Sequence, residues 1–146
     1  MIGFITCGKS KRPERCKAKD LYNSPLSKNK QLYLKVLYPN IDIYILSAKH
    51  GVLNLDDVID PYDTELTRKD CEQKTLWKTK VSKQLKQFDS NEDIIFLGAK
   101  HYYEPINEYF RGTKIAPLLG LTPVYQNVKL LEGINSYYDS KKRRLF

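Results

Sequence analysis

The sequence predicts a small α/β domain in which a mainly parallel sheet lies between two layers of helices. Three observations lead to this prediction: short apolar runs rich in β-branched residues, helical patterns between them, and a length of 146 residues that suits one domain. Strands that alternate with helices form right-handed βαβ units. We therefore expect a three-layer, Rossmann-like α/β domain over residues 1–146, with a basic C-terminal tail at 141–146.

The predicted strands come from three runs of apolar residues. They are Met1–Cys7, Ile41–Ser47 and Asp93–Gly98. Each run is continuously apolar over most of its length, as in strands that are covered on both faces. The segment Thr113–Leu118 is a fourth candidate, although Pro117 argues against it because proline cannot donate a hydrogen bond within a sheet.

Four helices are expected. The first begins at Pro25, with Ser24 as its N-cap, and ends before Pro39. The others are expected over about residues 68–88, from His101 or Tyr102 onward, and over roughly Asn127–Tyr138. Their expected apolar faces are Leu26, Tyr33, Val36 and Leu37 in the first helix, Trp77, Val81, Leu85 and Phe88 in the second, Ile106, Tyr109 and Phe110 in the third, and Val128, Leu131, Ile134 and Tyr138 in the last.

The positive charge is concentrated at the two ends of the chain. The sequence has 25 basic and 17 acidic residues, a formal net charge of +8. Residues 1–20 contribute +4 and residues 141–144 another +4, which leaves the rest neutral. An anionic partner is therefore expected: nucleic acid, with DNA favoured, or a nucleotide. No apolar run approaches the ~18 residues of a membrane helix, so no membrane partner is expected.

The cysteine pattern does not indicate a disulfide framework or a structural zinc site. The three cysteines, Cys7, Cys16 and Cys71, are odd in number and show no C-x-x-C spacing. A cytoplasmic location is therefore expected, with no cofactor and no metal. A magnesium ion held by Asp56, Asp57 and Asp60 is an alternative for which no motif argues.

Basic and polar residues follow the ends of the predicted strands, where open parallel sheets bind their ligands. The first strand leads into Cys7-Gly8-Lys9-Ser10-Lys11, whose groups could hold a phosphate or carboxylate, although an ordinary solvated loop is an equal alternative. The other two strands end in Ser47-Ala48-Lys49-His50 and Gly98-Ala99-Lys100-His101. If these strands are parallel neighbours, all three basic ends face one crevice.

Proton-transfer and stacking groups lie in the same segments. His50 has a side chain that titrates near neutrality, and capping is the alternative role. Asp57 and Asp63 could act as a general base or stabilise a sugar cation, or else form ion pairs with the lysines. Tyr62 and Tyr102 could stack on a base, whereas most tyrosines of such domains simply pack between layers.

Several motifs resemble those of a known family. The segment 47–53 (SAKHGVL), followed by Asp57 and Pro61-Tyr62, resembles the S-x-[KR]-[YH]-G-[LV]-[LI] … D-x-[IM]-x-P-Y signature of the YaaA-like proteins, and more closely that of small uncharacterised domains related to them. Residues 7–11, 20–25 and 117–121 match further motifs of those domains. Residues 122–126 depart from the I-G-x-Q stretch that often follows. The resemblance implies links to DNA binding, to oxidative DNA damage and to modified bases, and some members look similar to base-excising glycosylases.

The sequence and the resemblance together predict an enzyme that processes a nucleotide or a nucleic-acid base, as an N-glycosidase or a base-modifying enzyme. The alternative is a non-catalytic DNA-binding protein linked to DNA damage or to phage and host defence. The expected catalytic residues are Asp63, Asp57 and His50, and the expected substrate-binding residues are Cys7, Gly8, Ser10, Lys11, Ser47, Lys49, Gly51, Tyr62, Gly98 and Tyr102. Lys9, Arg12, Lys141, Lys142, Arg143 and Arg144 are expected to contact the nucleic-acid backbone.

Overall fold

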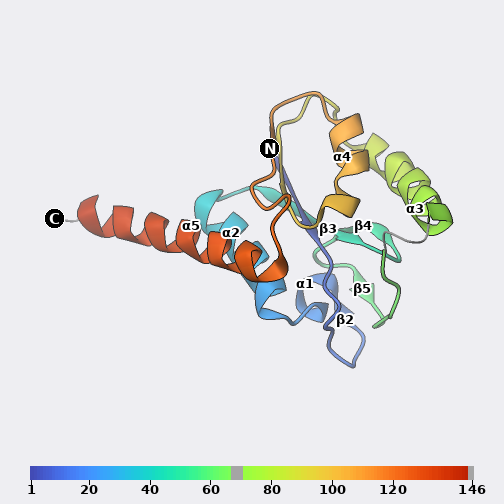
Figure 1. Ribbon diagram of the computed structural model, residues 1–146, viewed down its shortest axis with the longest axis horizontal. Coiled ribbons are helices and arrows are strands. Elements are labelled where there is room, and N and C mark those ends of the chain that lie inside the picture. Colours follow the sequence, from blue (N-terminus) through green and yellow to red (C-terminus); the bar gives the residue numbers. More distant parts are fainter. Residues whose placement is uncertain (67–70, 145–146) are drawn as a thin grey trace.

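A computed structural model, which describes residues 1–66 and 71–144 with side chains as far as residue 142, confirms the α/β fold (Figure 1). Its main sheet has five strands in the order β4-β3-β1-β6-β7. These strands are β1 (Ile2–Thr6), β3 (Asp42–Ser47), β4 (Gly51–Asn54), β6 (Ile94–Leu97) and β7 (Lys114–Ile115). Only β4 runs antiparallel, so the sheet is mixed but mainly parallel.

The central strand, β1, is buried along its whole length between two parallel neighbours. It pairs with β3 from Ile2 opposite Asp42 to Thr6 opposite Leu46. It pairs with β6 on the other side, again starting at Ile2. Because the three strands run in parallel and in register, their carboxyl ends lie at one edge of the sheet.

Helices cover both faces of the sheet and give three layers (Figure 1). The helical elements are α1 (Ala18–Leu21), α2 (Pro25–Leu37), α3 (Cys71–Gln84), η1 (Leu85–Gln87), η2 (Lys100–Tyr102), α4 (Glu104–Tyr109) and α5 (Pro123–Arg144). On one face, Trp77 and Val81 of α3 and Ile106 of α4 pack with Phe4 and Phe96. On the other face, side chains of α1, α2 and α5 pack with alternate residues of the same strands. No helix of the described residues is long and apolar enough to span a bilayer.

Helix α2 begins where the sequence predicts, but it buries a different face. The Ser24 side chain accepts a hydrogen bond from the Ser27 N–H at 3.1 Å, and Pro25 is the first helical residue. The buried residues are Ser27, Lys30, Gln31 and Leu34, whereas the predicted face is only half-buried. The predicted buried face was wrong for two reasons. Helix α2 directs polar side chains such as Lys30 toward the end of β1, and its apolar residue Tyr33 packs against α5.

Helix α5 is longer than predicted, and most of its predicted apolar stripe is exposed. Its buried residues are Gln126, Leu130 and Ile134, whereas Val128, Leu131 and Tyr138 are 45, 40 and 48% exposed. A narrow contact with α2 explains the difference, since Gly133 lies against the ring of Tyr33 and only one helix face reaches the core. The outer part of α5 extends away from the rest of the molecule (Figure 1).

A two-stranded antiparallel sheet, which the sequence does not predict, ties the first loop to the acidic segment. It pairs β2 (Cys16–Lys17) with β5 (Val58–Ile59). Two further backbone bonds extend the contact, from Ala18 N–H to Asp57 O (2.7 Å) and from Lys19 N–H to Leu55 O (2.9 Å). Strands of two residues leave no periodic pattern in a sequence. Their pairing nevertheless brings residues 7–19 and 54–66 together at the strand ends.

Candidate active site at the strand ends

The order of the strands places the reversal point of the sheet between β1 and β6. After β1 the chain crosses to β3 on one side, and after β3 it returns to β6 on the other side of β1. Open α/β sheets bind ligands outside the carboxyl ends of the strands at such a reversal. Gly98 closes β6 against β1, since a Cβ atom at this position would lie 2.2 Å from Thr6 Cγ2. Cys7, the residue after β1, therefore lies at the reversal point.

A cavity of about 200 Å³ lies beside this point and contains groups of both charges. Its lining residues are Cys7, Gly8, Lys9, Lys11, Asp63, Thr64, Glu65 and Tyr102. The first loop contributes the two lysines and the segment after β5 contributes the two carboxylates. Lys11 Nζ donates a hydrogen bond to the Lys9 carbonyl oxygen at 3.2 Å, which holds the loop in a closed curve.

Tyr102 joins the two sides of the cavity. Its hydroxyl lies 3.5 Å from Cys7 Sγ, accepts a backbone hydrogen bond from Leu66, and its ring meets the edge of Trp77 with centroids 5.3 Å apart. Burial, and then the nearby Cys7, raises the pKa of Tyr102. The Tyr102 phenol is therefore neutral at physiological pH and can donate a hydrogen bond, but it cannot serve as a base.

Hydrogen bonds link the hydroxyl groups of Ser47, Tyr62 and Tyr22 into a chain beside Lys11. Ser47 Oγ accepts the N–H groups of Lys49 (3.2 Å) and His50 (3.0 Å), so its own hydrogen goes to Tyr62 Oη at 2.6 Å. Tyr62 in turn donates to Tyr22 Oη at 2.5 Å. Burial raises the pKa of Tyr62, and it raises that of Tyr22 to about 12, so both phenols stay protonated. This chain fixes the segment 61–63 relative to β3.

The ammonium group of Lys11 lies over the ring of Tyr62, 4.5 Å from its centroid. Tyr62 is only 8% exposed, so it supports Lys11 and is not an open stacking surface. A second cavity, of about 240 Å³, lies next to this pair. It shares Lys9, Lys11 and Asp63 with the first cavity and adds Arg12, Pro13, Pro61 and Tyr62.

Lys30 is a site residue that the sequence analysis missed. It extends from α2 to the end of β1, where its ammonium donates to Thr6 Oγ1 at 3.1 Å, and it is only 4% exposed. Burial lowers the pKa of Lys30 to about 8, while the neighbouring Cys7 acts in the opposite direction. The helical register contains the signal, since Lys30 lies one turn before the fully buried Leu34. A buried ammonium beside Cys7 adds positive potential to the strand ends.

The predicted common crevice of three Lys-bearing strand ends does not form. Lys11 lines the cavity, whereas Lys100 and His101 line a separate hollow with Lys74 and Glu104. Lys49 is exposed and lines none of these cavities; its carbonyl oxygen accepts a bond from Lys80. The prediction was wrong because β3 and β6 are separated by β1, and because β3 turns directly back into β4.

The β3–β4 turn uses two predicted substrate-binding residues, Ser47 and Gly51, and the predicted catalytic residue His50 for structure. Ser47 is fully buried in the hydroxyl chain, and Gly51 has φ of 73° with the Gln84 side chain 2.1 Å from where a Cβ would lie. The ring of His50 meets the edge of Tyr62, with centroids 5.5 Å apart. Partial burial, then the ammonium groups of Lys49 and Lys80, lowers the pKa of His50, so its ring is neutral.

The remaining predicted residues lie outside the cavity. Asp57 Oδ2 accepts the Asn54 N–H at 2.9 Å in the turn between β4 and β5. Ser10 Oγ donates to Asn23 Oδ1 at 2.6 Å and joins two loops. Lys141 and Lys142 lie on the far end of α5, remote from β2 and β5 (Figure 1). The side chains of Arg143 and Arg144 lie outside the described residues.

The three aspartates of the magnesium alternative have separate partners. Asp56 pairs with Lys17 (3.5 Å) and Lys19 (3.7 Å), and Asp60 pairs with Arg15 at 3.0 Å. Among residues 1–66 and 71–144, no three His, Cys, Asp or Glu side chains converge in a way that could hold a metal ion.

The fold and the site define a class of protein: a small doubly wound α/β domain with a cavity of mixed charge at its strand reversal. Within this class, the chain belongs to DUF6884, a family of unknown function whose model matches residues 2–131.

Two curated proteins are similar to the chain. A glutamate racemase of Staphylococcus epidermidis (strain ATCC 12228 / FDA PCI 1200) is 30% identical over 121 residues, which cover 78% of this chain but only 41% of the racemase. The uncharacterized protein YfjM of Bacillus subtilis (strain 168) is 32% identical over 111 residues, covering 71% of this chain and 73% of YfjM. No solved structure matches the chain significantly.

Proposed function

We propose that the protein is an enzyme that acts on a nucleotide or a nucleic-acid base, and that it releases or modifies the base as an N-glycosidase-like hydrolase. One observation carries the proposal: two ammonium groups and two carboxylates line a single cavity of about 200 Å³ at the strand reversal. The lysines suit a phosphate, and the carboxylates suit the cation that develops on a sugar when its base departs.

Asp63 and Glu65 are the proposed catalytic pair. Both line the cavity, two residues apart in the segment that the hydroxyl chain and Tyr102 hold in place. A carboxylate at the sugar can orient a water molecule or stabilise positive charge, and a second carboxyl group can carry the proton. Asp57 and His50, the other predicted catalytic residues, lie outside the lining of this cavity and have no proposed part in the chemistry.

Lys9 and Lys11 are proposed to hold the phosphate, with the buried ammonium of Lys30 adding to the positive potential. The Tyr102 hydroxyl and Cys7 lie at the inner wall, where a base would contact them. The proposed relationship to the YaaA-like proteins supports a base as the ligand, since the matching residues Cys7, Lys11, Pro61 and Tyr62 lie at or beside the cavity.

The test is mass spectrometry of the free bases and nucleosides that the protein releases from modified and unmodified DNA, RNA and mononucleotides. We expect Asp63→Asn to lower the rate of release by about 100-fold or more, as the loss of a general base or charge stabiliser does. Asp60→Asn is the matched control, because Asp60 is exposed and its ion-pair partner among the described residues is Arg15, on the surface. Equal rates for wild type and Asp63→Asn would remove Asp63 from the mechanism. Binding of nucleic acid without any released product would favour the non-catalytic alternative.

The relative named glutamate racemase makes a free amino acid a second ligand class to test. Cys7, Lys9, Lys11 and the carboxylates could bind an amino acid through its own two charges. Exchange of the α-hydrogen of L-glutamate for deuterium in heavy water, followed by NMR, would favour this class over a base. We expect no exchange.

A further inference from the structure

We propose that a groove between α2 and the loop before it binds the phosphate backbone of a single-stranded nucleic acid that leads into the cavity. This inference rests on the proposed function and extends it from a single nucleotide to a strand. The groove has a volume of about 380 Å³. Its lining residues are Arg12, Lys19, Asp20, Tyr22, Asn23, Lys28, Gln31, Leu32 and Lys35.

Most of the positive charge in this groove has no counter-charge. Arg12, Lys28 and Lys35 form no ion pair with any residue of the described chain, and Asp20, the one carboxylate in the groove, approaches none of them within ion-pair distance. Lys19 alone is paired, with Asp56 at 3.7 Å. Lys28 and Lys35 lie two turns apart on α2, both exposed, so they present two cations along one line.

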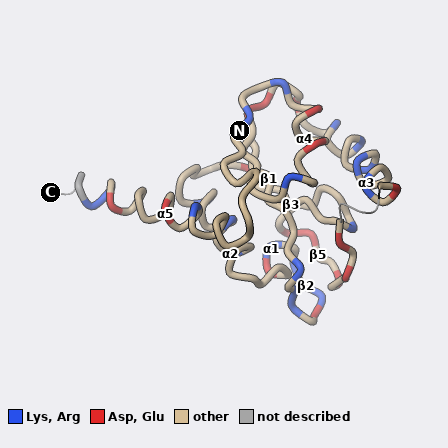
Figure 2. Tube along the Cα trace, viewed as in Figure 1, with Lys and Arg blue, Asp and Glu red and all other residues tan. Residues whose placement is uncertain are grey.

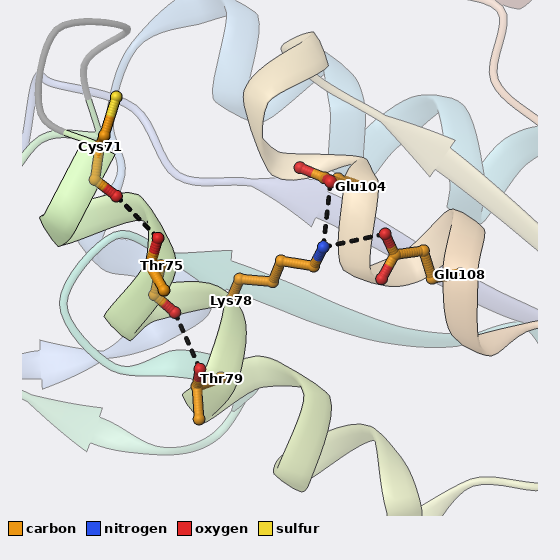
Figure 3. A network of polar contacts seen from close by, with 6 residues as sticks. All are labelled: Cys71, Thr75, Lys78, Thr79, Glu104 and Glu108. Carbon is orange, nitrogen blue, oxygen red and sulfur yellow. Dashed lines mark hydrogen bonds and ion pairs between the residues drawn. The ribbon is translucent and has the colours of Figure 1, made fainter.

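A lysine of α3, on the other face of the sheet, is neutralised by carboxylates. Lys78 of α3 donates to Glu104 (3.0 Å) and Glu108 (2.9 Å) of α4, which together raise its pKa (Figure 3). A lysine held between two carboxylates has little affinity left for a phosphate. Arg12, Lys28 and Lys35 in the groove have no such carboxylate partner among the described residues, and Lys and Arg gather in the loop beside it, around β2 (Figure 2).

The groove is continuous with the candidate active site. Arg12 lines both the groove and the cavity of about 240 Å³, and that cavity shares Lys9, Lys11 and Asp63 with the catalytic cavity. A basic path thus runs from Lys35 through Lys28, Arg12 and Lys11 to the proposed catalytic pair. The carboxylates in the lining of this path are Asp20 in the groove and Asp63 and Glu65 at the catalytic end.

A single strand fits this path better than a duplex or a compact anion does. Proteins that hold single strands combine a basic groove along the backbone with apolar surface against the bases. The groove contains such surface at Leu32, which is 43% exposed, whereas the ring of Tyr22 in its lining is buried. A base that is processed in the cavity must also leave the nucleic-acid double helix, so the nucleotides next to it are unpaired.

The experiment measures binding of a fluorescein-labelled single-stranded oligonucleotide of about 15 nucleotides, by anisotropy, between about 50 and 200 mM salt. The test variant is Lys28→Gln/Lys35→Gln. The matched control is Lys83→Gln/Lys86→Gln, which removes two exposed lysines near the end of α3. We expect the test variant to bind at least about tenfold more weakly, with a salt slope shallower by about 1.4, since each contact to a single strand contributes about 0.7. The control should bind as the wild type does.

Equal affinities for the test variant and the control would overturn the proposal. Displacement of the strand by polyglutamate at equal charge would also overturn it, because the groove would then recognise acidic polypeptides. A duplex that binds more tightly than the single strand, with the same loss in the test variant, would overturn the assignment to single strands. Groove-dependent binding without base release from any substrate would support this proposal and contradict the proposed function, so the two can fail separately.

Discussion

The single residue Lys30 combines the cost of a buried ammonium group with a place beside the candidate site. It is nearly fully buried, its hydrogen-bond partner is the neutral Thr6 hydroxyl, and no carboxylate of the described residues pairs with it. Burying an ammonium without a counter-ion is unfavourable, and proteins keep such groups where function requires a charge. The cost of Lys30 is therefore consistent with a role in attracting an anion to the end of β1.

We predict that Lys30→Met stabilises the protein by about 2 kcal/mol at neutral pH. A pKa of about 8 in place of 10.5 corresponds to a burial cost of about 3 kcal/mol, and the lost bond to Thr6 offsets about 1 kcal/mol. Urea unfolding measures the difference. The variant should at the same time bind the oligonucleotide more weakly, because the buried charge is gone.

The same residue predicts a specific pH dependence. Between pH 8 and about 10, the folded protein has a neutral Lys30 while the unfolded chain keeps this proton, so the unfolded state binds more protons and stability rises with pH. Above about pH 10 the tyrosines of the unfolded chain ionise, whereas folded Tyr22, with its pKa of about 12, does not, and stability falls. The stability of Lys30→Met should therefore not increase between pH 8 and about 10, but it should still decrease above about pH 10. Parallel profiles for wild type and variant would contradict the prediction.

Among the elements, α5 is a helix whose buried face differs from the apolar pattern of its sequence. The reason is that only a narrow face of α5 packs against α2. Two adjacent leucines lie on opposite sides of its contact with α2: Leu130 is fully buried and Leu131 is 40% exposed. The apolar stripe expected from the sequence includes Leu131 and omits Leu130. The close approach of Gly133 to Tyr33 and the bond from Asn29 to Asn127 (2.7 Å) determine which side faces inward.

We predict that Leu130→Ala lowers the free energy of unfolding by about 3 kcal/mol, because it leaves a cavity in a packed core. Leu131→Ala serves as the control and should lower it by less than about 1 kcal/mol. Urea unfolding at several protein concentrations measures both values. A larger loss for Leu131→Ala, with a dependence on concentration, would mean that a second copy of the chain covers the exposed stripe.

In the whole molecule, the net charge of +8 is divided between two distant places. One is the basic loop and groove beside the candidate site, and the other is the end of α5, which extends away from the sheet (Figures 1 and 2). The end of α5 also lies beyond the residues that match the family. Exposed charges separated by more than about 8–10 Å act nearly independently at physiological salt. The two basic regions are therefore separate in their effects.

We predict that Lys141→Gln/Lys142→Gln lowers oligonucleotide affinity by less than about threefold at 150 mM salt, although it removes the same charge as the groove variant. Anisotropy titrations with the two double variants side by side measure this. A loss equal to that of Lys28→Gln/Lys35→Gln would show that the backbone contact expected for the basic tail is a principal one.

Part of the candidate site could be predicted because its position depends on strand ends. The continuous apolar runs locate β1, β3 and β6, and the reversal between β1 and β6 makes Cys7, Gly8 and Lys11 cavity residues. Asp63 was predicted from its place in an acidic run. Lys30 was missed because its helix pairs polar with apolar side chains on the buried face, which weakens the periodic pattern. Ser47 and His50 were predicted to bind or process a ligand, because the motif SAKHG looks the same in a sequence whether it forms a structural turn or lines a pocket.

The sequence by itself determined the fold class, the central strands and the start of α2, because these depend on local apolar runs and on capping residues that act within a few positions. Only the tertiary structure decided which charges lie together. The antiparallel return of β4 removes Lys49 and His50 from the cavity, while the small β2–β5 sheet brings Asp63 and Glu65 to Lys9 and Lys11. The β2–β5 pairing joins residues about 40 positions apart in the chain, from Cys16 opposite Ile59 to Lys17 opposite Val58. Such contacts depend on the packing of the whole domain and leave no periodic pattern along the chain.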